Sequence, residues 1–223
     1  YMKIPQLRKQ TEKKNCHGYS WEDDYSWIHQ DNCLEILRDT KKLNPEVRKY
    51  LEEENSYTKE IMRDTENLQK KIFKEIEGRI KLDDESLPFK DKKYDYWTKT
   101  TKEGNYAKKL RKKIGSDKVE CYFDGDLEAK GKKFFSTGDL AVSNNDEFLA
   151  FSVDDKGGEY FTIFVRRIVD NKIIEKIEDT AGGIVWSYDD KSFFYRKHDS
   201  QKRPRQILQH RLGSPNTEDI LIF

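Results

Sequence analysis

The stretch Gly182-Gly183-Ile184-Val185-Trp186-Ser187 repeats the stretch Gly138-Asp139-Leu140-Ala141-Val142-Ser143, which lies 44 residues earlier in the chain. Beyond this stretch the repeat continues without a gap through the pairs Asp146/Asp190, Leu149/Phe193, Phe151/Tyr195, Ile163/Ile207, Phe164/Leu208, Arg167/Arg211 and Ile168/Leu212. A unit of this length with four short β-prone segments has the size of one blade of a β-propeller. Because one such sheet cannot bury both of its faces alone, the repeat predicts blades that pack side by side. Chance agreement between two hairpin-rich stretches is the alternative.

Short β-prone segments separated by turn-forming sequences dominate the chain after residue 85. The predicted strands are Tyr94–Thr100, Tyr106–Ile114, Val119–Phe123, Gly138–Ser143, Phe148–Val153, Tyr160–Ile168, Ile173–Ile177, Gly182–Ser187, Ser192–Arg196, Gln206–Leu212 and Asp219–Phe223. The segment from Leu87 to Asp124 resembles a third, more divergent blade. We therefore expect repeat units at about 86–137, 138–181 and 182–223 within a partial propeller of two to three blades that spans residues 86–223.

Residues 1–85 have a helical character instead, and we expect them to form an N-terminal arm. Asn44-Pro45 is a helix start, since Asn caps free N–H groups and Pro suits the first turn. Apolar residues then recur at spacings near three and four up to Ile61, and a second stripe runs from about Asp64 to Ile80, with Gly78 as a stop. The two helices form either a hairpin or one broken helix.

Composition limits the class of protein. Charged residues make up 38% of the chain and hydrophobic residues 35%, but aromatic residues reach 13%, which predicts a folded protein with a highly charged surface. The net charge of +1 argues against a nucleic-acid partner. No apolar run approaches the roughly 20 residues of a membrane span. Three scattered cysteines fit a reducing compartment, so we expect a cytoplasmic protein.

The number of repeats is too small for a closed propeller, which typically needs at least four blades. The chain also stops within a strand signal at Asp219–Phe223. The simplest expectation is truncation. Two alternatives remain open, namely self-association that covers the exposed ends and a smaller closed sheet disguised by the repeat.

Five stretches in collinear order resemble the oligopeptidase B branch of the prolyl oligopeptidase family of serine peptidases. They are Trp21-Glu22-Asp23-Asp24-Tyr25-Ser26-Trp27, residues 45–58 from Pro45 to Thr58, residues 78–88 from Gly78 to Pro88, Thr180-Ala181-Gly182-Gly183-Ile184-Val185-Trp186-Ser187 and His210-Arg211-Leu212-Gly213-Ser214-Pro215. Residues 8–17 and the basic strand near Lys108 match poorly. The resemblance implies a seven-bladed propeller that caps an α/β-hydrolase domain, a Ser-Asp-His triad in that C-terminal domain, and cleavage of short peptides after Arg or Lys.

The resemblance also implies that this chain carries no chemistry of its own. A nucleophile of this family needs Gly-x-Ser-x-Gly, and neither Gly18-Tyr19-Ser20 nor Gly213-Ser214-Pro215 supplies it. We therefore expect no catalytic, cofactor-binding or metal-binding residue here, no cofactor, and an α/β-hydrolase domain that is absent from this chain. The expected partners are that domain and oligopeptide substrates, with no nucleic acid and no membrane.

Three other groups of residues could in principle carry a function. Cys16, His17, His29 and Cys33 could ligate zinc, but their spacing is looser than in structural zinc sites, so unconnected surface residues are expected. The basic residues at 108–113 are expected on a solvated edge strand rather than a nucleic-acid stripe. The acidic clusters Asp23-Asp24 and Asp83-Asp84-Glu85 are expected in turns or caps. Trp186 is the strongest core candidate among the tryptophans.

Two functional hypotheses follow from this. The first is the N-terminal arm and gating propeller region of a serine endopeptidase of the oligopeptidase B type, a cytoplasmic hydrolase when intact but inactive as this fragment. The second is a non-enzymatic β-repeat module that binds another protein.

Overall fold

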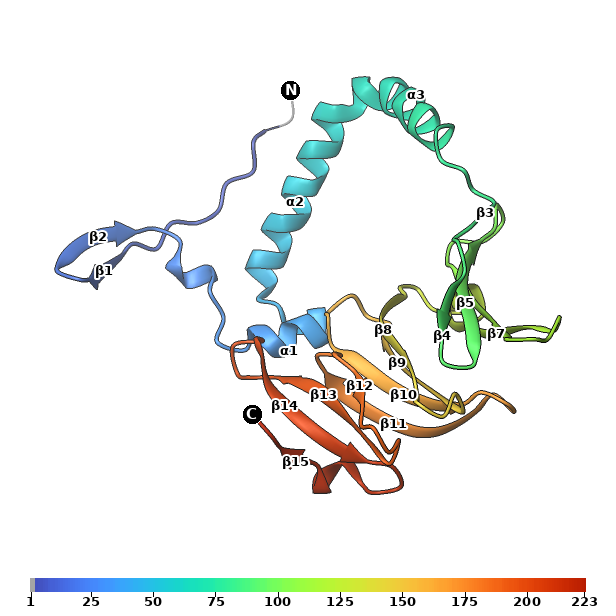
Figure 1. Ribbon diagram of the computed structural model, residues 1–223. Helices are drawn as coiled ribbons and strands as arrows, with labels where there is room; N and C mark the ends of the chain where they lie inside the picture. Colours follow the sequence, from blue (N-terminus) through green and yellow to red (C-terminus); the bar gives the residue numbers. More distant parts are fainter. Residues whose placement is uncertain (1–2) are drawn as a thin grey trace. The chain divides into compact units, whose positions relative to one another are not determined.

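The computed structural model describes residues 3–223, which divide after Ile80 into two compact units (Figure 1). The first unit contains a hairpin of β1 (Glu12–Cys16) and β2 (Tyr19–Asp23), the short helix α1 (Cys33–Arg38), α2 (Pro45–Met62) and α3 (Glu66–Glu77). Single 3-10 turns lie at Ser26–Ile28, Thr40–Lys42 and Arg63–Thr65. The second unit is mainly β, as the sequence predicts.

The predicted helix start is confirmed. The Asn44 side chain accepts a hydrogen bond from the Glu46 N–H at 2.8 Å, and Pro45 is the first residue of α2. Only the 3-10 turn at Arg63–Thr65 separates α2 from α3, so the two form one broken helix and not a hairpin. Gly78 caps α3, as expected. The Gly keeps right-handed helical angles there, which is why the apolar stripe can continue to Ile80.

The β1–β2 hairpin and α1 are not predicted by the sequence pattern. His17 and Gly18 both take positive φ values, 49° and 82°, which is the geometry of a tight hairpin turn. The strand that precedes them is Glu12-Lys13-Lys14-Asn15-Cys16, which has no alternation of apolar and polar residues. Its pairing with β2 therefore depends on the turn and the cross-strand contacts rather than on a hydrophobic face.

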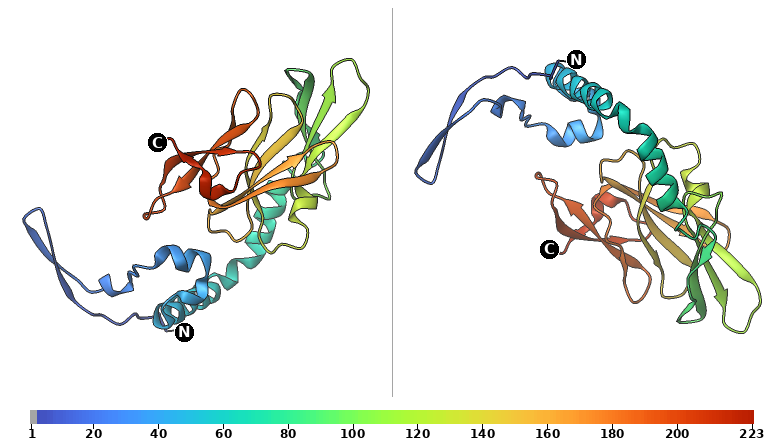
Figure 2. Two further views of the ribbon diagram at one scale, coloured as in Figure 1. Left: turned by 90° about the horizontal axis from the view of Figure 1, so that it is seen from below. Right: turned by 90° about the horizontal axis from the view of Figure 1, so that it is seen from above.

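The second unit contains three antiparallel sheets. The first comprises β3 (Asp84–Glu85), β4 (Phe89–Asp91), β5 (Tyr94–Thr100), β6 (Lys108–Lys113) and β7 (Val119–Asp124), and α4 (Gly125–Ala129) follows it. The second comprises β8 (Ser136–Val142), β9 (Phe148–Asp154), β10 (Phe161–Arg167) and β11 (Lys172–Thr180). The third comprises β12 (Val185–Trp186), β13 (Ser192–His198), β14 (Pro204–Arg211) and β15 (Ile220–Leu221), with a 3-10 turn at Asn216–Glu218. The sheets lie side by side in chain order (Figures 1 and 2).

The 44-residue repeat is present in the hydrogen-bond register itself. Ala141 faces Ala150 across β8 and β9, and the residues 44 positions later, Val185 and Phe194, face each other across β12 and β13. The turns repeat as well, because the Ser143 N–H donates to the Phe148 carbonyl and the Ser187 N–H to the Ser192 carbonyl, both at 2.9 Å. Four strands follow in the same order in the second and third sheets, as the 44-residue repeat predicts. The alternative of a chance agreement between two hairpin-rich stretches is therefore wrong.

The core consists of two clusters, one between each pair of neighbouring sheets. Leu149 and Phe151 of the second sheet pack against Phe123 of the first, with the Phe123 and Phe151 rings edge to face at 5.3 Å. Their equivalents in the third sheet, Phe193 and Tyr195, pack against the second sheet in the same way. The four equivalent side chains of the second and third sheets are at most 1% exposed, namely Leu149, Phe151, Phe193 and Tyr195. Burial of each such side chain contributes about 1.5–3 kcal/mol to stability, so side-by-side packing holds the sheets together, as the repeat predicts.

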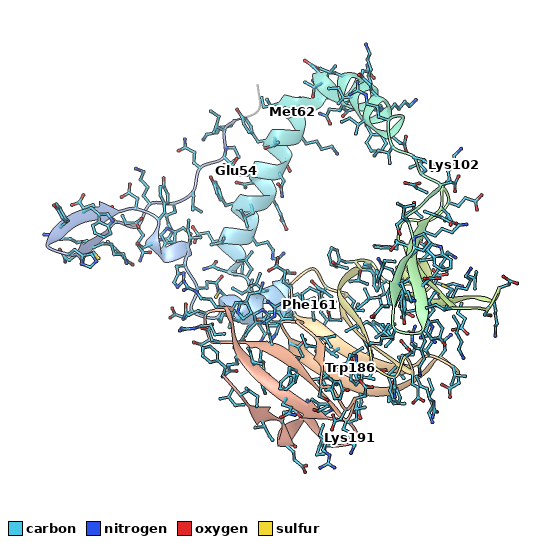
Figure 3. All side chains as sticks on the ribbon, in the orientation of Figure 1. Glu54, Met62, Lys102, Phe161, Trp186 and Lys191 are labelled. Atoms are coloured by element: carbon cyan, nitrogen blue, oxygen red, sulfur yellow. The ribbon has the colours of Figure 1, made fainter. Side chains whose placement is uncertain are left out.

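Trp186 lies at the second of these contacts, in the position labelled in Figure 3. Its ring is edge to face with Phe193 at 5.6 Å, and its Nε1–H donates to the Ala141 carbonyl of the preceding sheet at 2.9 Å. The side chain is half-buried rather than fully buried. The Trp186 ring thus packs in the core, as expected, and its indole N–H also joins the third sheet to the second through a hydrogen bond.

Candidate functional site: the cleft between the first two sheets

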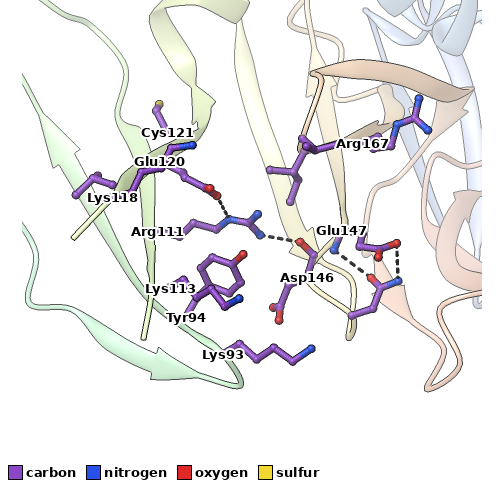
Figure 4. A pocket seen from close by; sticks show the side chains of 14 residues that line it. Lys93, Tyr94, Arg111, Lys113, Lys118, Glu120, Cys121, Asp146, Glu147 and Arg167 are labelled. Carbon is purple, nitrogen blue, oxygen red and sulfur yellow. Dashed lines mark hydrogen bonds and ion pairs between the residues drawn. The ribbon is translucent and has the colours of Figure 1, made fainter. Parts of the chain in front are cut away.

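A cleft of about 770 Å³ separates the ends of β5, β6 and β7 from the turn that joins β8 to β9 (Figure 4). Its residues come from the first and second sheets, and its centre is the guanidinium of Arg111. Charged side chains dominate the lining, which comprises Lys93, Tyr94, Arg111, Lys113, Lys118, Val119, Glu120, Cys121, Asn145, Asp146, Glu147, Arg167, Ile168 and Val169.

Arg111 connects three groups at once. Its Nε donates to Glu120 Oε2 at 3.0 Å, its Nη1 donates to the Asp146 carbonyl at 2.8 Å, and its guanidinium lies 4.2 Å from the centre of the Tyr94 ring (Figure 4). The side chain is only 5% exposed. A planar guanidinium can satisfy several acceptors and stack on an aromatic ring simultaneously, so Arg111 fastens the first sheet to the second.

Asp146, whose backbone carbonyl accepts the hydrogen bond from Arg111, has an uncommon backbone conformation, with φ at 66°. Its Oδ1 accepts a hydrogen bond from the Tyr96 hydroxyl at 3.1 Å. Burial, reinforced by the nearby Asp146 carboxylate, raises the pKa of Tyr96, which therefore stays a hydrogen-bond donor. The equivalent residue in the next unit, Asp190, also has a positive φ, and its carboxylate accepts from the Asn144 and Asn145 N–H groups at 2.6 and 2.7 Å. Each of these aspartates holds its turn to the preceding sheet.

The cleft offers no arrangement for nucleophilic catalysis. Its one thiol, Cys121, has a pKa raised by desolvation and by the nearby Asp124, which disfavours the reactive thiolate. Neither a serine nor a histidine lines it. What the arrangement can do is join two sheets and hold the spacing between them.

The basic residues of β6 correct one expectation. Residues 108–113 are expected on a solvated edge strand, but β6 pairs with β5 on one side and β7 on the other, and Arg111 is buried. The physical reason is that the lysines in this strand meet polar partners on the neighbouring strands: Lys108 pairs with Asp124 at 2.8 Å and Lys109 donates to Thr98 at 3.0 Å. A single sequence cannot show such partners.

Sequence reasoning also missed Asp146 and Tyr96 as contacts between sheets. The signal that could have identified Asp146 was present, since the repeat aligns it with Asp190. An aspartate at the same place in two units, at the end of a Ser-Asn-Asn or Ser-Tyr-Asp turn, indicates a required left-handed residue. No pattern, however, pairs Tyr96 with a carboxylate 50 residues away.

The other residues considered from sequence are not brought together. Cys16 ends β1, His17 forms the hairpin turn, His29 follows a 3-10 turn and Cys33 begins α1. Among residues 3–223 no cluster of three or more His, Cys, Asp or Glu side chains is arranged to hold a metal ion. Gly18-Tyr19-Ser20 lies at the β1–β2 hairpin, and Gly213-Ser214 forms the turn after β14. The part of the chain that the structure describes has no helix long and apolar enough to span a bilayer.

The two acidic clusters occupy different settings. Asp23 is the last residue of β2. Asp24 follows it, and its carboxylate accepts hydrogen bonds from Lys9 Nζ at 2.6 Å and from Thr11 Oγ1 at 2.7 Å. Asp84 and Glu85 form β3. The expectation of turn or cap residues is wrong for Asp84 and Glu85, because both pair with β5 through Thr100 and Lys99. Neither acidic cluster lines the cleft.

Comparison with known proteins decides the family. A family model described as the N-terminal β-propeller domain of prolyl oligopeptidase matches residues 5–223. The chain belongs to the prolyl oligopeptidase family. Among curated members of this family, dipeptidyl aminopeptidase BI of Pseudoxanthomonas mexicana is 27% identical over 93% of the chain and 30% of its own length. Protease 2 of Moraxella lacunata is 26% identical over 100% of the chain and 32% of its own length.

Solved structures of the prolyl oligopeptidase family agree. Oligopeptidase B from Leishmania major superimposes with a TM-score of 0.87 at 26% identity, covering 100% of this chain and 33% of that protein. Oligopeptidase B from Trypanosoma brucei, solved with covalently bound antipain in a closed form, superimposes with a TM-score of 0.84 at 25% identity, covering 99% of this chain and 32% of that protein. The chain thus spans about a third of the length of the relatives it matches, and the resemblance to the oligopeptidase B propeller is confirmed.

Proposed function

We propose that this chain is the N-terminal arm and the first blades of the gating propeller of a serine oligopeptidase that cleaves short peptides after Arg or Lys. The observation that supports this most is the match to oligopeptidase B over the whole chain, at a TM-score of 0.87. In this proposal residues 1–85 are the arm, and residues 86–223 are blades with units at about 86–137, 138–181 and 182–223. The propeller limits entry to peptide-sized substrates, and its intact form has seven blades.

The proposal places the catalytic triad outside these 223 residues, so this chain alone has no hydrolytic activity. The absence of Gly-x-Ser-x-Gly from the sequence supports this. The composition of the cleft, with its desolvated Cys121 and no serine or histidine, is consistent with a structural role.

The proposed partner of the arm is the peptidase's own α/β-hydrolase domain. On α3 the apolar side chains Leu68, Ile72, Phe73 and Ile76 are 46–65% exposed, although they form a single stripe. A stripe of this kind is typical of a helix that packs against another surface. The three free cysteines, Cys16, Cys33 and Cys121, support a reducing, cytoplasmic location.

A second proposed contact lies on the third sheet. In the second sheet Ala141, Ala150 and Ile163 face the following sheet and are covered by it, whereas their equivalents Val185, Phe194 and Ile207 have no following sheet among the described residues. Val185 is 62% exposed. In the intact enzyme another blade would cover this face, and in the isolated chain a second copy would cover it. Sedimentation that shows a monomer at every concentration would contradict self-association of the fragment.

The activity is tested with two polypeptides, namely this chain and a longer product of the same coding sequence. The probe is a fluorogenic peptide amide with Arg or Lys before the scissile bond, and the matched control peptide has Glu there. We expect turnover only by the longer polypeptide, only after Arg or Lys, and its loss with a serine-directed inhibitor. Inhibitor-sensitive hydrolysis by this chain alone would refute its inactivity. Equal cleavage of the Glu peptide by the longer product would refute the specificity.

A further inference from the structure

The turn after the first strand is built in the same way in the second and third sheets. The Ser143 hydroxyl donates to the Asn145 side chain at 2.6 Å, and the Ser187 hydroxyl donates to the Asp189 side chain at 2.7 Å. The carbonyl of each serine accepts a hydrogen bond from the N–H three residues later, at 3.1 Å in both turns. The residue that donates this bond has a positive φ in both turns. The two turns therefore direct their remaining backbone N–H groups in the same way.

In the second sheet two of these N–H groups bind a carboxylate. The N–H groups of Asn144 and Asn145 donate to the two carboxylate oxygens of Asp190 at 2.6 and 2.7 Å, and the Asn144 side-chain amide adds a third hydrogen bond at 2.9 Å. Successive backbone N–H groups that face one carboxylate form an anion-binding nest, and hydrogen bonds this short are typical of a charged acceptor. The turn of the second sheet thus binds Asp190 of the third sheet.

The equivalent N–H groups of the third sheet belong to Tyr188 and Asp189. Neither N–H has an acceptor among residues 3–223, and Tyr188 is 96% exposed. The Asp189 carboxylate does not serve as the acceptor, because it accepts from the Ser187 hydroxyl and the Lys191 N–H of its own turn at 2.7 and 3.1 Å. The third sheet therefore presents to solvent the same pair of donors that binds a carboxylate one unit earlier.

One type of residue suits both requirements of this contact. The acceptor one unit earlier stands at a position with a positive φ, which glycine, asparagine and aspartate adopt most readily. Of these three, only aspartate offers two carboxylate oxygens to two donors. In the second and third sheets this position is occupied by Asp146 and Asp190, and the carboxylate of each binds the preceding sheet.

We propose that the N–H groups of Tyr188 and Asp189 bind the carboxylate of an aspartate in the next repeat unit of the longer polypeptide. The repeat places this aspartate about 44 residues after Asp190, at the same position of the turn. This inference rests on the proposed function, since it requires a propeller that continues beyond residue 223. Because Tyr188 has no side-chain amide in the place of Asn144, the contact consists of the two backbone hydrogen bonds alone.

The exchange rates of the backbone amides in the two turns test this contact directly. In this chain, studied by NMR at a concentration where sedimentation shows a monomer, the Asn144 and Asn145 amides should be protected, and the Tyr188 and Asp189 amides should exchange at the rates of an unstructured peptide. In the full-length peptidase, studied by mass spectrometry with residue-level fragmentation, the Tyr188 and Asp189 amides should exchange on the order of tenfold more slowly, because a hydrogen bond to a charged group must open first.

Two matched variants assign the protection to a carboxylate. Asp190→Asn keeps a residue that tolerates a positive φ but leaves one side-chain acceptor, so in this chain it should raise the exchange rate of the Asn144 or Asn145 amide on the order of tenfold. The same aspartate-to-asparagine change in the next unit should do this for the Tyr188 or Asp189 amide of the full-length peptidase.

The proposal is overturned by any residue other than aspartate at the predicted position of the next unit. It is also overturned if the Tyr188 and Asp189 amides exchange as fast in the full-length peptidase as in this chain. Cleavage of the Arg or Lys peptide amide is an independent readout. An active peptidase with these two amides unprotected refutes the contact and not the proposed function, whereas an inactive polypeptide with both amides protected refutes the function and not the contact.

Discussion

Replacement of Arg111 by alanine tests whether the cleft fastens the first two sheets together. The variant removes the hydrogen bond to the buried Asp146 carbonyl, which costs about 1–3 kcal/mol when an acceptor is left unsatisfied. It also removes the stacking over Tyr94, which contributes about 0.5–2 kcal/mol. Glu120 is 35% exposed and can be rehydrated, so the loss of its ion pair adds at most about 1 kcal/mol. We expect a total destabilisation of about 2–4 kcal/mol.

The measurement is equilibrium unfolding of the chain in urea, followed by tryptophan fluorescence and circular dichroism. Lys113→Ala is the matched control, because Lys113 lies on the same strand two residues away and is exposed, so its free energy of unfolding should change by less than about 0.5 kcal/mol. Hydrogen exchange should show the Arg111→Ala loss in β5, β6 and the β8–β9 turn. If Arg111→Ala and Lys113→Ala have the same stability, Arg111 does not connect the sheets.

Three further predictions concern other parts of the chain. Gly183→Ala should lower the free energy of unfolding by about 1–2 kcal/mol, because φ is 79° there and an alanine is strained in that left-handed conformation; an unchanged free energy of unfolding in urea would contradict the prediction. Phe73→Glu should leave the stability of this chain within about 0.5 kcal/mol, since the ring is 65% exposed, but should lower activity of the longer peptidase; unchanged activity there would show that α3 is not a docking surface. Desolvation opposes ionisation of Asp124, yet the hydrogen bond from Lys108 prevails and lowers its pKa. Its stabilisation is therefore present at neutral pH and lost on acidification, so the wild type should lose more stability between pH 6 and 3 than Asp124→Asn, and equal losses would refute this.

Elements with a strong periodic or capping signal were predictable. The strand Tyr94–Thr100 has the predicted bounds, because its aromatic and β-branched residues alternate and turns flank it. The start of α2 at Pro45 was predicted because Asn44-Pro45 satisfies free backbone groups locally. The β1–β2 hairpin and α4 were missed because their residues are polar and their stability depends on turns and on neighbouring segments.

The candidate site was less predictable than the fold. The repeat identified Asp146 and Asp190 as equivalent residues but not what they bind. Arg111 was placed on a solvated edge because a lysine-rich strand is usually exposed. Its burial depends on Tyr94 beside it and on Asp146, which is 35 residues further along the chain. Such a contact exists only once two sheets pack together.

The amino-acid sequence alone determined that residues 138–223 form two like sheets, because a 44-residue repeat of alternating apolar side chains can be buried only by lateral packing. It also determined that a helix starts after the cap residue Asn44. The sequence contains no Gly-x-Ser-x-Gly motif. The tertiary structure decided which polar residues join the sheets. Hydrogen bonds such as Arg111–Asp146 and His210–Asp219 depend on distances of about 3 Å and on exclusion of water, and these conditions arise only when strands remote in the chain are brought together.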